Sequence, residues 1–377
     1  MFEEKNERFS LTCGHAEYII KLHGQNSIRR GGIRMIDLDL YMADIEERIS
    51  PEAEDVIWHA WQEWIDRRNT SGPFVPPCRP ASPSKLDWPH VNINDALDDV
   101  TLSVYRELES INHHLTRGTS AILRIRANFG VGSIPSAIGA PRFVMPYEAD
   151  TLPNVLSIGE EKMVQWLDAP MPGLQDGNFE MIAKVSEVFK KLKASYPCFA
   201  RYVHIEQPDL QSPLDNLELL WGSEFFYSLY DDPALVHAAL DKLTRVTEQY
   251  MDHWIASFPQ ECTFASYFQH VDRGAICVRS DSAMNLSPDM YAEFVAPYDG
   301  RLIGKYGGIV HFCGRGDHYI DHLSRLPGLH GVNMSQPHLN DMEKIYAATI
   351  DRGIHLSLSV QPFEISRPNL QHLIFLP

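Results

Sequence analysis

The sequence predicts an α/β protein, a (β/α)8 (TIM) barrel with a mostly helical amino-terminal extension. From residue 119 onward, about eight short apolar runs alternate with amphipathic segments, which is the pattern of βα units around a parallel sheet. The length of this stretch suits such a barrel, which takes about 250 residues. A Gly-X-Gly-X-X-Gly fingerprint and a GxxxxGK(S/T) motif are both missing, so a nucleotide-binding sheet is unsupported. We therefore expect a helical extension with a Pro-rich connection at residues 1–117, packed on a barrel at residues 118–377.

Composition and charge exclude several classes of protein. The chain has 377 residues, of which 44% are hydrophobic and 22% charged, and is therefore expected to be globular. The net charge of −17 argues against nucleic acid or an anionic membrane as the main partner. No apolar run approaches the roughly 18 residues of a membrane span. The amino terminus is acidic and lacks an apolar core, so we expect no signal peptide.

The cysteines indicate the cellular compartment. All six are widely spaced and none forms a CxxC pair. In a chain of this size, that spacing predicts a reduced, cytoplasmic protein without a disulfide framework.

Two features stand out in the extension. Trp58, Trp61 and Trp64 recur at helical spacing, which predicts a packing face rather than a site. Residues 71–90 contain six prolines, which predicts an extended connection, either a surface loop or a lid over a pocket.

The barrel elements follow from apolar runs and helix-start signals. The expected strands lie at 121–127, 142–146, 197–206, 262–269, 275–278, the run ending in His311-Phe312-Cys313, 329–334 and 354–360. The expected helices lie at 181–194, 233–258, 288–306, 317–325 and 342–352. The second and third begin with Pro233 and Pro288, after acidic or Ser residues that suit helix amino termini.

The His311-Phe312-Cys313 run carries the clearest chemical signal. Residues at i and i+2 of a strand share one face, so His311 and Cys313 point the same way at the strand's carboxyl end. An imidazole beside a thiolate makes half of a zinc site. The alternative is a buried cysteine and a histidine bonded to backbone. The glycine-rich turn that follows could offer N–H groups to an anion, although we favour a tight turn with Asp317 as helix cap.

Several segments together resemble the uroporphyrinogen decarboxylase superfamily. They are DSAMNLSPDMYAEFVAPY at 281–298, GGIVHFCG at 307–314, Tyr196-Pro197 before a strand, and LYDDPALVHAALDKL at 229–243. The resemblance covers roughly residues 119–370 and implies a (β/α)8 barrel. Its decarboxylases carry an early arginine-rich substrate motif, which this chain lacks. Its corrinoid- and coenzyme M-linked methyltransferases bind zinc through His-X-Cys and a later cysteine. His311 and Cys313 match, but no cysteine follows Cys313.

A zinc site of this kind therefore needs a third ligand from elsewhere. Glu206 and His204 rank first, because they end a strand of the same barrel and share a face. Further candidates are His270, Glu293 and Gln361. The alternative for the His204–Glu206 pair is a structural hydrogen-bonded couple.

Other polar residues suit catalysis or substrate binding. Asp281 follows a short strand and could act as an acid or base, or orient a metal ligand. The alternative for Asp281 is a solvated loop aspartate. Glu206 could also act as an acid or base. Arg124 and Arg126 alternate with apolar residues and could face inward to bind a carboxylate, or lie at the rim. Asn128 and Gln336 follow strands and are expected to line the same mouth.

The sequence thus predicts an enzyme of the methyltransferase branch, with zinc and a small thiol or corrinoid-linked methyl group. One alternative is cofactor-free decarboxylation of a polycarboxylate. Another is a binding protein that has lost its chemistry, because fold does not imply function. A corrinoid protein is an expected partner, besides the small-molecule substrate. The resemblance also implies a homodimer.

Overall fold

The structure is a computed structural model that describes residues 36–68, 72–268, 270–358 and 369–375. These residues belong to one unit, Ile36–Pro377. Within this described part, no helix is both long enough and apolar enough to span a bilayer. The predicted Gln361 lies outside the described residues.

A parallel sheet of five strands organises the carboxyl-terminal half. Its strand order is β11-β10-β9-β8-β7, and every neighbouring pair is parallel. The bounds are β7 Ile276–Arg279, β8 Gly308–Phe312, β9 Leu329–Met334, β10 His355–Leu358 and β11 Leu373–Phe375. Single parallel bridges extend it at both edges, from Phe74 to Ile374 and from Gln211 to Arg279. The predicted parallel α/β architecture is confirmed.

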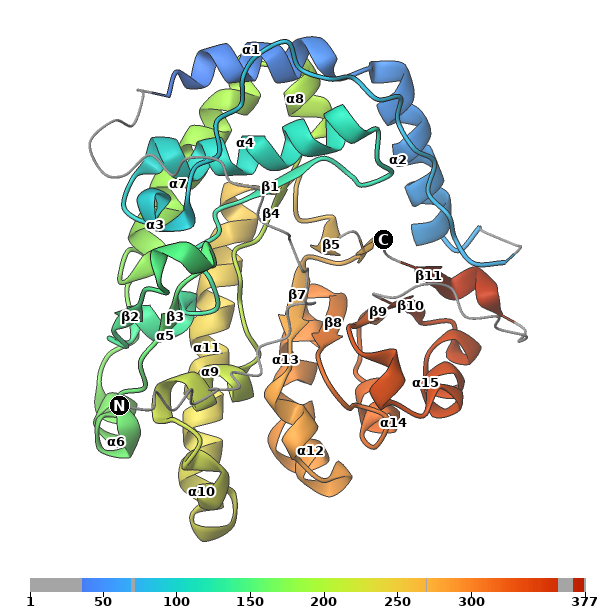
Figure 1. The fold of residues 1–377 in the computed structure, drawn as a ribbon. Coiled ribbons are helices and arrows are strands. Elements are labelled where there is room, and N and C mark those ends of the chain that lie inside the picture. The colour runs from blue at the N-terminus through green and yellow to red at the C-terminus, as the bar shows by residue number, and fades with distance from the viewer. Residues whose placement is uncertain (1–35, 69–71, 269, 359–368, 376–377) are drawn as a thin grey trace, which may run out of the picture. The chain divides into compact units, whose positions relative to one another are not determined.

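Two further strands form a separate parallel pair, β1 (Arg124–Arg126) and β4 (His204–Glu206). The pairing among the described strands does not close into a barrel. Figure 1 shows β1 and β4 beside α4 and the five-stranded sheet below and to the right.

Three predicted barrel strands form only in part or pair differently from the prediction. Residues 142–143 form β2, which pairs antiparallel with β3 (Asn154–Val155). Residues 264–267 form β5, which makes an antiparallel hairpin with β6 (His270–Arg273). Much of the expected strand 197–206 is helix α8 (Pro197–Tyr202). Pro197 occupies its first turn, where the missing N–H costs nothing, and Phe199 and Tyr202 are buried three residues apart on one helix face.

The amino-terminal helices share the core of the sheet. Their bounds are α1 Leu38–Arg48, α2 Pro51–Ile65, α3 Ile93–Ala96 and α4 Val100–Arg117. Asp37, Ser50, Asn92 and Asp99 cap them by accepting backbone N–H bonds. Side chains of α1 and α4, such as Ile45 and Leu108, lie in the same apolar cluster as Leu123. The predicted packing face of α2 is confirmed, since Trp61 and Trp64 are fully buried.

The proline-rich segment is tied down by a buried ion pair. Arg79 donates to both carboxylate oxygens of Glu54 on α2, at 2.6 and 3.0 Å, and to the carbonyl of Thr119. Both side chains are almost inaccessible to solvent. The segment runs from α2 to α3 and is held against α2 and the residues before β1, so it does not serve as a free lid.

The remaining helices connect and cover the strands. Their bounds are α5 Ser133–Ala137, α6 Gly159–Asp168, α7 Asn178–Ser195, α9 Pro213–Trp221, α10 Phe225–Asp231, α11 Pro233–Ser257, α12 Pro288–Phe294, α13 Ala296–Tyr306, α14 Ile320–Leu323 and α15 Met342–Ala348. The predicted helix at 288–306 is therefore two helices, which meet at Val295. α13 packs on β7 and α11, as Figure 1 shows.

Candidate metal centre

The parallel register places polar residues of neighbouring strands at the same height. Arg279 on β7 pairs with His311 on β8, which pairs with Asn333 on β9, which pairs with Ser357 on β10. Because register partners share a face, these four side chains form one layer on one side of the sheet. All four are buried.

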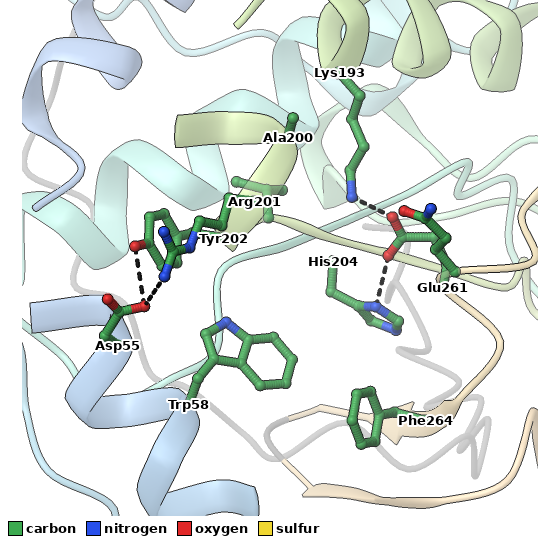
Figure 2. Close-up of a pocket in the computed structure, with 11 residues that line it drawn as sticks. Asp55, Trp58, Lys193, Ala200, Arg201, Tyr202, His204, Glu261 and Phe264 are labelled. Atoms are coloured by element: carbon green, nitrogen blue, oxygen red, sulfur yellow. Dashed lines mark hydrogen bonds and ion pairs between the residues drawn. The ribbon is translucent and has the colours of Figure 1, made fainter. Parts of the chain in front are cut away.

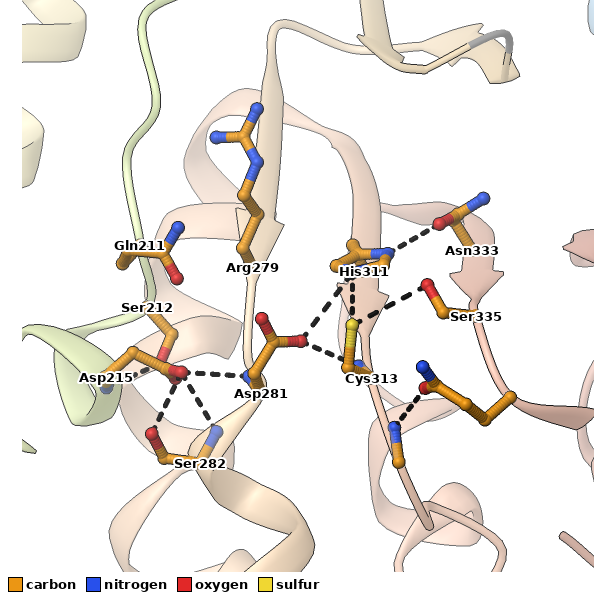
Figure 3. A network of polar contacts seen from close by, with 12 residues as sticks. Gln211, Ser212, Asp215, Arg279, Asp281, Ser282, His311, Cys313, Asn333 and Ser335 are labelled. Atoms are coloured by element: carbon orange, nitrogen blue, oxygen red, sulfur yellow. Dashed lines mark hydrogen bonds and ion pairs between the residues drawn. The ribbon is translucent and has the colours of Figure 1, made fainter. Parts of the chain in front are cut away.

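Two residues further along β7 and β8, beyond the carboxyl ends of these strands, lie Asp281 and Cys313. Together with His311 they are the one group of histidine, cysteine and acidic residues in the described part whose ligand atoms could hold a metal ion, all within 4.8 Å of one another. His311 Nε2 lies 3.3 Å from Cys313 Sγ and 3.6 Å from Asp281 Oδ1. Figure 3 shows the three side chains pointing toward one another.

His311 is oriented by its other ring nitrogen. Nδ1 lies 2.5 Å from Asn333 Oδ1, so it donates a hydrogen bond and leaves the lone pair on Nε2. The Tyr267 ring covers the imidazole at a centroid distance of 4.1 Å. Burial lowers the pKa of His311, although the nearby Asp281 carboxylate opposes the shift. The imidazole is therefore neutral near pH 7, which is the form that binds metals.

Asp281 is positioned by a second aspartate. The Oδ1 of Asp215 accepts hydrogen bonds from the backbone N–H groups of Asp281 and Ser282, both at 2.9 Å, and from the Ser282 hydroxyl at 3.0 Å. Burial raises the pKa of Asp215 well above its ordinary value, and the charge of Asp281 adds to the shift. Ser212, which caps α9, bonds the other oxygen.

The turn after Cys313 is held by amide side chains. Gln336, predicted to line the mouth, accepts a hydrogen bond from the Gly314 N–H at 2.5 Å, and Asn340 accepts from Gly316 and Asp317. These N–H groups are therefore not available to an anion. The predicted cap is wrong, because Tyr319 occupies the N-cap position of α14 and Asp317 bonds Arg315 instead.

Glu206 is not among the three residues that the structure brings together. Its carboxylate on β4 is bonded by the Arg124 guanidinium and the Ser266 hydroxyl. Although burial opposes ionisation, Arg124 and Arg126 hold the pKa of Glu206 below its ordinary value. Asn128 has a buried side-chain oxygen without a hydrogen-bond partner among the described residues.

His204 lies at a different pocket. It begins β4, and its Nδ1 donates to Glu261 at 2.9 Å. Although burial opposes its ionisation, His204 and then Lys193 lower the pKa of Glu261 to about 2. These groups line a cavity of about 330 Å³. Figure 2 shows Trp58 and Phe264 on one side of it.

Two other predicted ligands also lie apart from the group of three. Glu293 is half-exposed on α12 and lies 3.6 Å from His237. His270 lies on β6, where its Nδ1 is 2.8 Å from the Ser357 hydroxyl.

Sequence reasoning missed several neighbours of the centre. Asn333 and Ser335 alternate on β9 and beyond it as His311 and Cys313 do on β8, and Cys313 Sγ lies 3.6 Å from Ser335 Oγ. That repeated i, i+2 spacing could have predicted that Asn333 and Ser335 lie beside His311 and Cys313. No sequence pattern marks Asp215 as a neighbour of the centre, because polar loops and helix starts contain many aspartates.

The comparisons with known proteins bear on the fold. No family model matches the chain, and no curated protein matches it. A solved structure, a methyltransferase from Methanosarcina mazei, is similar with a TM-score of 0.55 at 14% sequence identity. The match covers 82% of this chain and 84% of that one. At this identity the likeness extends to the fold, so the chain has an α/β architecture of the kind found in that methyltransferase.

Proposed function

We propose that this chain is a zinc-dependent methyltransferase whose metal ion is held by Asp281, His311 and Cys313. The observation that carries the proposal is the convergence of a carboxylate, an imidazole and a thiol, with all ligand atoms within 4.8 Å. Catalytic zinc takes three protein ligands of these types and keeps a fourth position open. The likeness of the fold to a methyltransferase supports the reaction class.

The surroundings of the three residues fit such an ion. Nitrogen and sulfur donors favour zinc over magnesium or calcium. Asn333 fixes the ring of His311 with Nε2 facing Cys313, and burial keeps that ring neutral. Asp281 then takes the place of the later cysteine that the related sequences supply.

The reaction needs a thiolate nucleophile. Bound zinc would lower the pKa of a substrate thiol and hold it as the thiolate. The protein's own groups do the rest. Asp215 holds the backbone of Asp281 in place, and Gln336 holds the Gly314 turn beside Cys313. We propose that Arg126 and Asn128 contact the substrate, and that a corrinoid-linked methyl group is the donor.

Decarboxylation of a polycarboxylate has less support. Such a substrate needs free arginines, and the Arg124 guanidinium is already engaged by the buried carboxylate of Glu206. A binding protein without chemistry is the outcome if the test below finds metal but no turnover.

The test combines zinc content with methyl transfer. We expect about one zinc per chain in purified protein. We also expect demethylation of methylcobalamin by a panel of small thiols, and its loss after chelation. Cys313→Ser should lose zinc and turnover, whereas Cys78→Ser, at an exposed cysteine, should retain both. Full turnover in metal-free protein, or equal zinc content in the two variants, would rule the proposal out.

A further inference from the structure

A chain of buried polar side chains leads away from the metal centre. Asn333 Nδ2 donates to Ser357 Oγ at 2.6 Å, and Ser357 Oγ lies 2.8 Å from His270 Nδ1. His270 Nε2 in turn lies 3.7 Å from Asp272 Oδ2. With the His311–Asn333 bond, hydrogen bonds join four of these side chains, and Asp272 lies just beyond hydrogen-bond distance of His270. Each of the five is at most 1% exposed.

The β5–β6 hairpin places His270 and Asp272, the last members of this series of polar side chains, against the sheet. β6 packs against β8 and β9, and His270 and Asp272 alternate on it, so they share a face. Room for them comes from Gly331 on β9. A Cβ there would lie 2.6 Å from His270 Cε1 and 2.9 Å from Asp272 Oδ2. Only glycine allows this approach without displacing the two side chains.

The hydrogen bonds that join His311 to His270 through Asn333 and Ser357 can run in two directions. In the first, His311 Nδ1–H donates to Asn333, whose amide donates to Ser357, whose hydroxyl donates to His270 Nδ1. His270 then carries its proton on Nε2. In the second, every donor and acceptor is exchanged, because the Asn333 amide can flip and the hydroxyl can rotate. His311 Nδ1 would then accept a hydrogen bond, and its proton would sit on Nε2.

Asp272 distinguishes the two directions. Although burial opposes its ionisation, the imidazoles of His270 and His355 hold the pKa of Asp272 below its ordinary value, so it is a carboxylate. His355 Nδ1 donates to it at 2.8 Å. In the first direction an N–H of His270 faces this carboxylate. In the second, the lone pair of Nε2 would face this buried negative charge, which is unfavourable. Asp281 lies 3.6 Å from Nε2 of His311 and favours the second direction, but its side chain is 36% exposed, so solvent screens its charge more than that of the buried Asp272.

We infer that Asp272 is a positioning residue that acts through His270, Ser357 and Asn333 to keep the proton of His311 on Nδ1 and its Nε2 free for a metal ion. The proton placement follows from the described contacts alone. Its consequence for metal affinity rests on the proposed function.

Imidazole nitrogen NMR of metal-free protein tests the proton placement directly. In ¹⁵N-histidine-labelled wild type, with the signals of His311 assigned by their loss in His311→Gln, we expect the Nδ1–H tautomer. Asp272→Asn keeps the shape but removes the charge, so the lone pair of His270 Nε2 no longer faces a carboxylate. We expect the Nε2–H tautomer of His311 to become populated beside the Nδ1–H form, with zinc affinity about 2- to 10-fold weaker because only a fraction of the protein then holds the binding tautomer.

Ser357→Ala provides a second test should Asp272→Asn fail to fold. Without the hydroxyl, the Asn333 amide is no longer held, so His311 should show both tautomers. Thr349→Val is the matched control, since it removes a buried hydroxyl whose one hydrogen bond among the described residues is to the Ile345 carbonyl, at 2.7 Å. This control should leave the tautomer of His311 and the zinc affinity unchanged.

The outcomes separate this inference from the proposed function. An Nδ1–H tautomer that remains the sole form in Asp272→Asn, or in Ser357→Ala if the first variant is unfolded, overturns the inference even when zinc binds. A tautomer that changes as expected in a protein with no zinc affinity supports the inference and overturns the proposed function instead.

Discussion

The backbone N–H of Cys313 donates a hydrogen bond to the carboxylate of Asp281 at 2.6 Å. This bond joins the segments that follow β7 and β8, although the two residues are 32 positions apart in sequence. It fixes the carboxylate beside the imidazole and the thiol before any ion arrives. Asp281 therefore has two separable roles, as an anchor of the turn and as a charged ligand.

Replacement of Asp281 should separate these roles. Asp281→Asn keeps a carbonyl to accept from the Cys313 N–H but removes the charge. We expect zinc affinity to fall by at least about 10- to 100-fold, the loss typical even of residues that only support a metal ligand, with little change in folding stability. Asp281→Ala should weaken zinc binding and also lower thermal stability. Competition with a chromophoric chelator measures the first quantity and thermal unfolding the second. Unchanged affinity in both variants would exclude Asp281 as a ligand.

We expect Asp215→Asn to leave folding stability nearly unchanged and Asp215→Ala to lower it. Burial and then the neighbouring charge of Asp281 raise its pKa well above the ordinary value, so the fold favours the neutral acid, which asparagine resembles in shape and charge. We expect Asp215→Asn to unfold in urea at nearly the wild-type midpoint. Asp215→Ala strands the buried donors of Asp281 and Ser282 and should cost about 2–3 kcal/mol. Equal damage in the two variants would show that the charged form is the one required.

Adjacent residues of α2 offer a comparison of a buried and an exposed ion pair. Glu54 is paired with Arg79 out of solvent, whereas Asp55 is half-exposed and pairs with the exposed Arg201. We expect Glu54→Gln to lower the free energy of unfolding by about 3–5 kcal/mol, because it leaves a buried guanidinium without its counter-charge. Asp55→Asn should cost less than about 1 kcal/mol. Urea unfolding of both variants measures the difference, and similar losses would contradict the structural role assigned to Arg79.

The sequence predicts which kinds of residue form the site better than it predicts which of them the fold brings together. The i, i+2 spacing of His311 and Cys313 predicts two side chains on one face, and the structure places them so. Glu206 ends a strand and Asp281 follows one, so nothing local distinguishes them as partners of these two residues. The distinction lies in strand pairing. β7 pairs with β8, which brings Asp281 to Cys313, whereas Glu206 pairs with Arg126 on β1.

The missed elements share a physical cause as well. Apolar runs of four residues fit either a parallel barrel strand or one arm of a hairpin, and β5 with β6 takes the second form. That hairpin carries Tyr267, His270 and Asp272 onto His311 and the chain behind it. Such long-range contacts leave no periodic signal in the sequence, so the polar chain could only be seen in the folded protein.

Asp299 should make stability depend on pH in a direction unusual for an aspartate. It lies fully buried on α13, and neither carboxylate oxygen has a hydrogen-bond partner among the described residues. Burial raises its pKa from the ordinary 3.8 to about 7, although the nearby Ser280 hydroxyl opposes the shift. Between these values the folded state binds a proton that the unfolded state does not, so stability falls as the pH rises through this window.

Asp299→Asn removes this titration and is the reference for it. Other groups, such as His114, whose pKa burial lowers to about 4, contribute to both proteins and cancel in the difference. We expect the stability of wild type relative to Asp299→Asn to fall by a few kcal/mol between pH 4 and pH 8, since each pKa unit is about 1.36 kcal/mol. Urea unfolding at several pH values measures it. A difference that is flat, or that rises with pH, would mean that Asp299 is ionised in the fold and paired with a group that stabilises its charge.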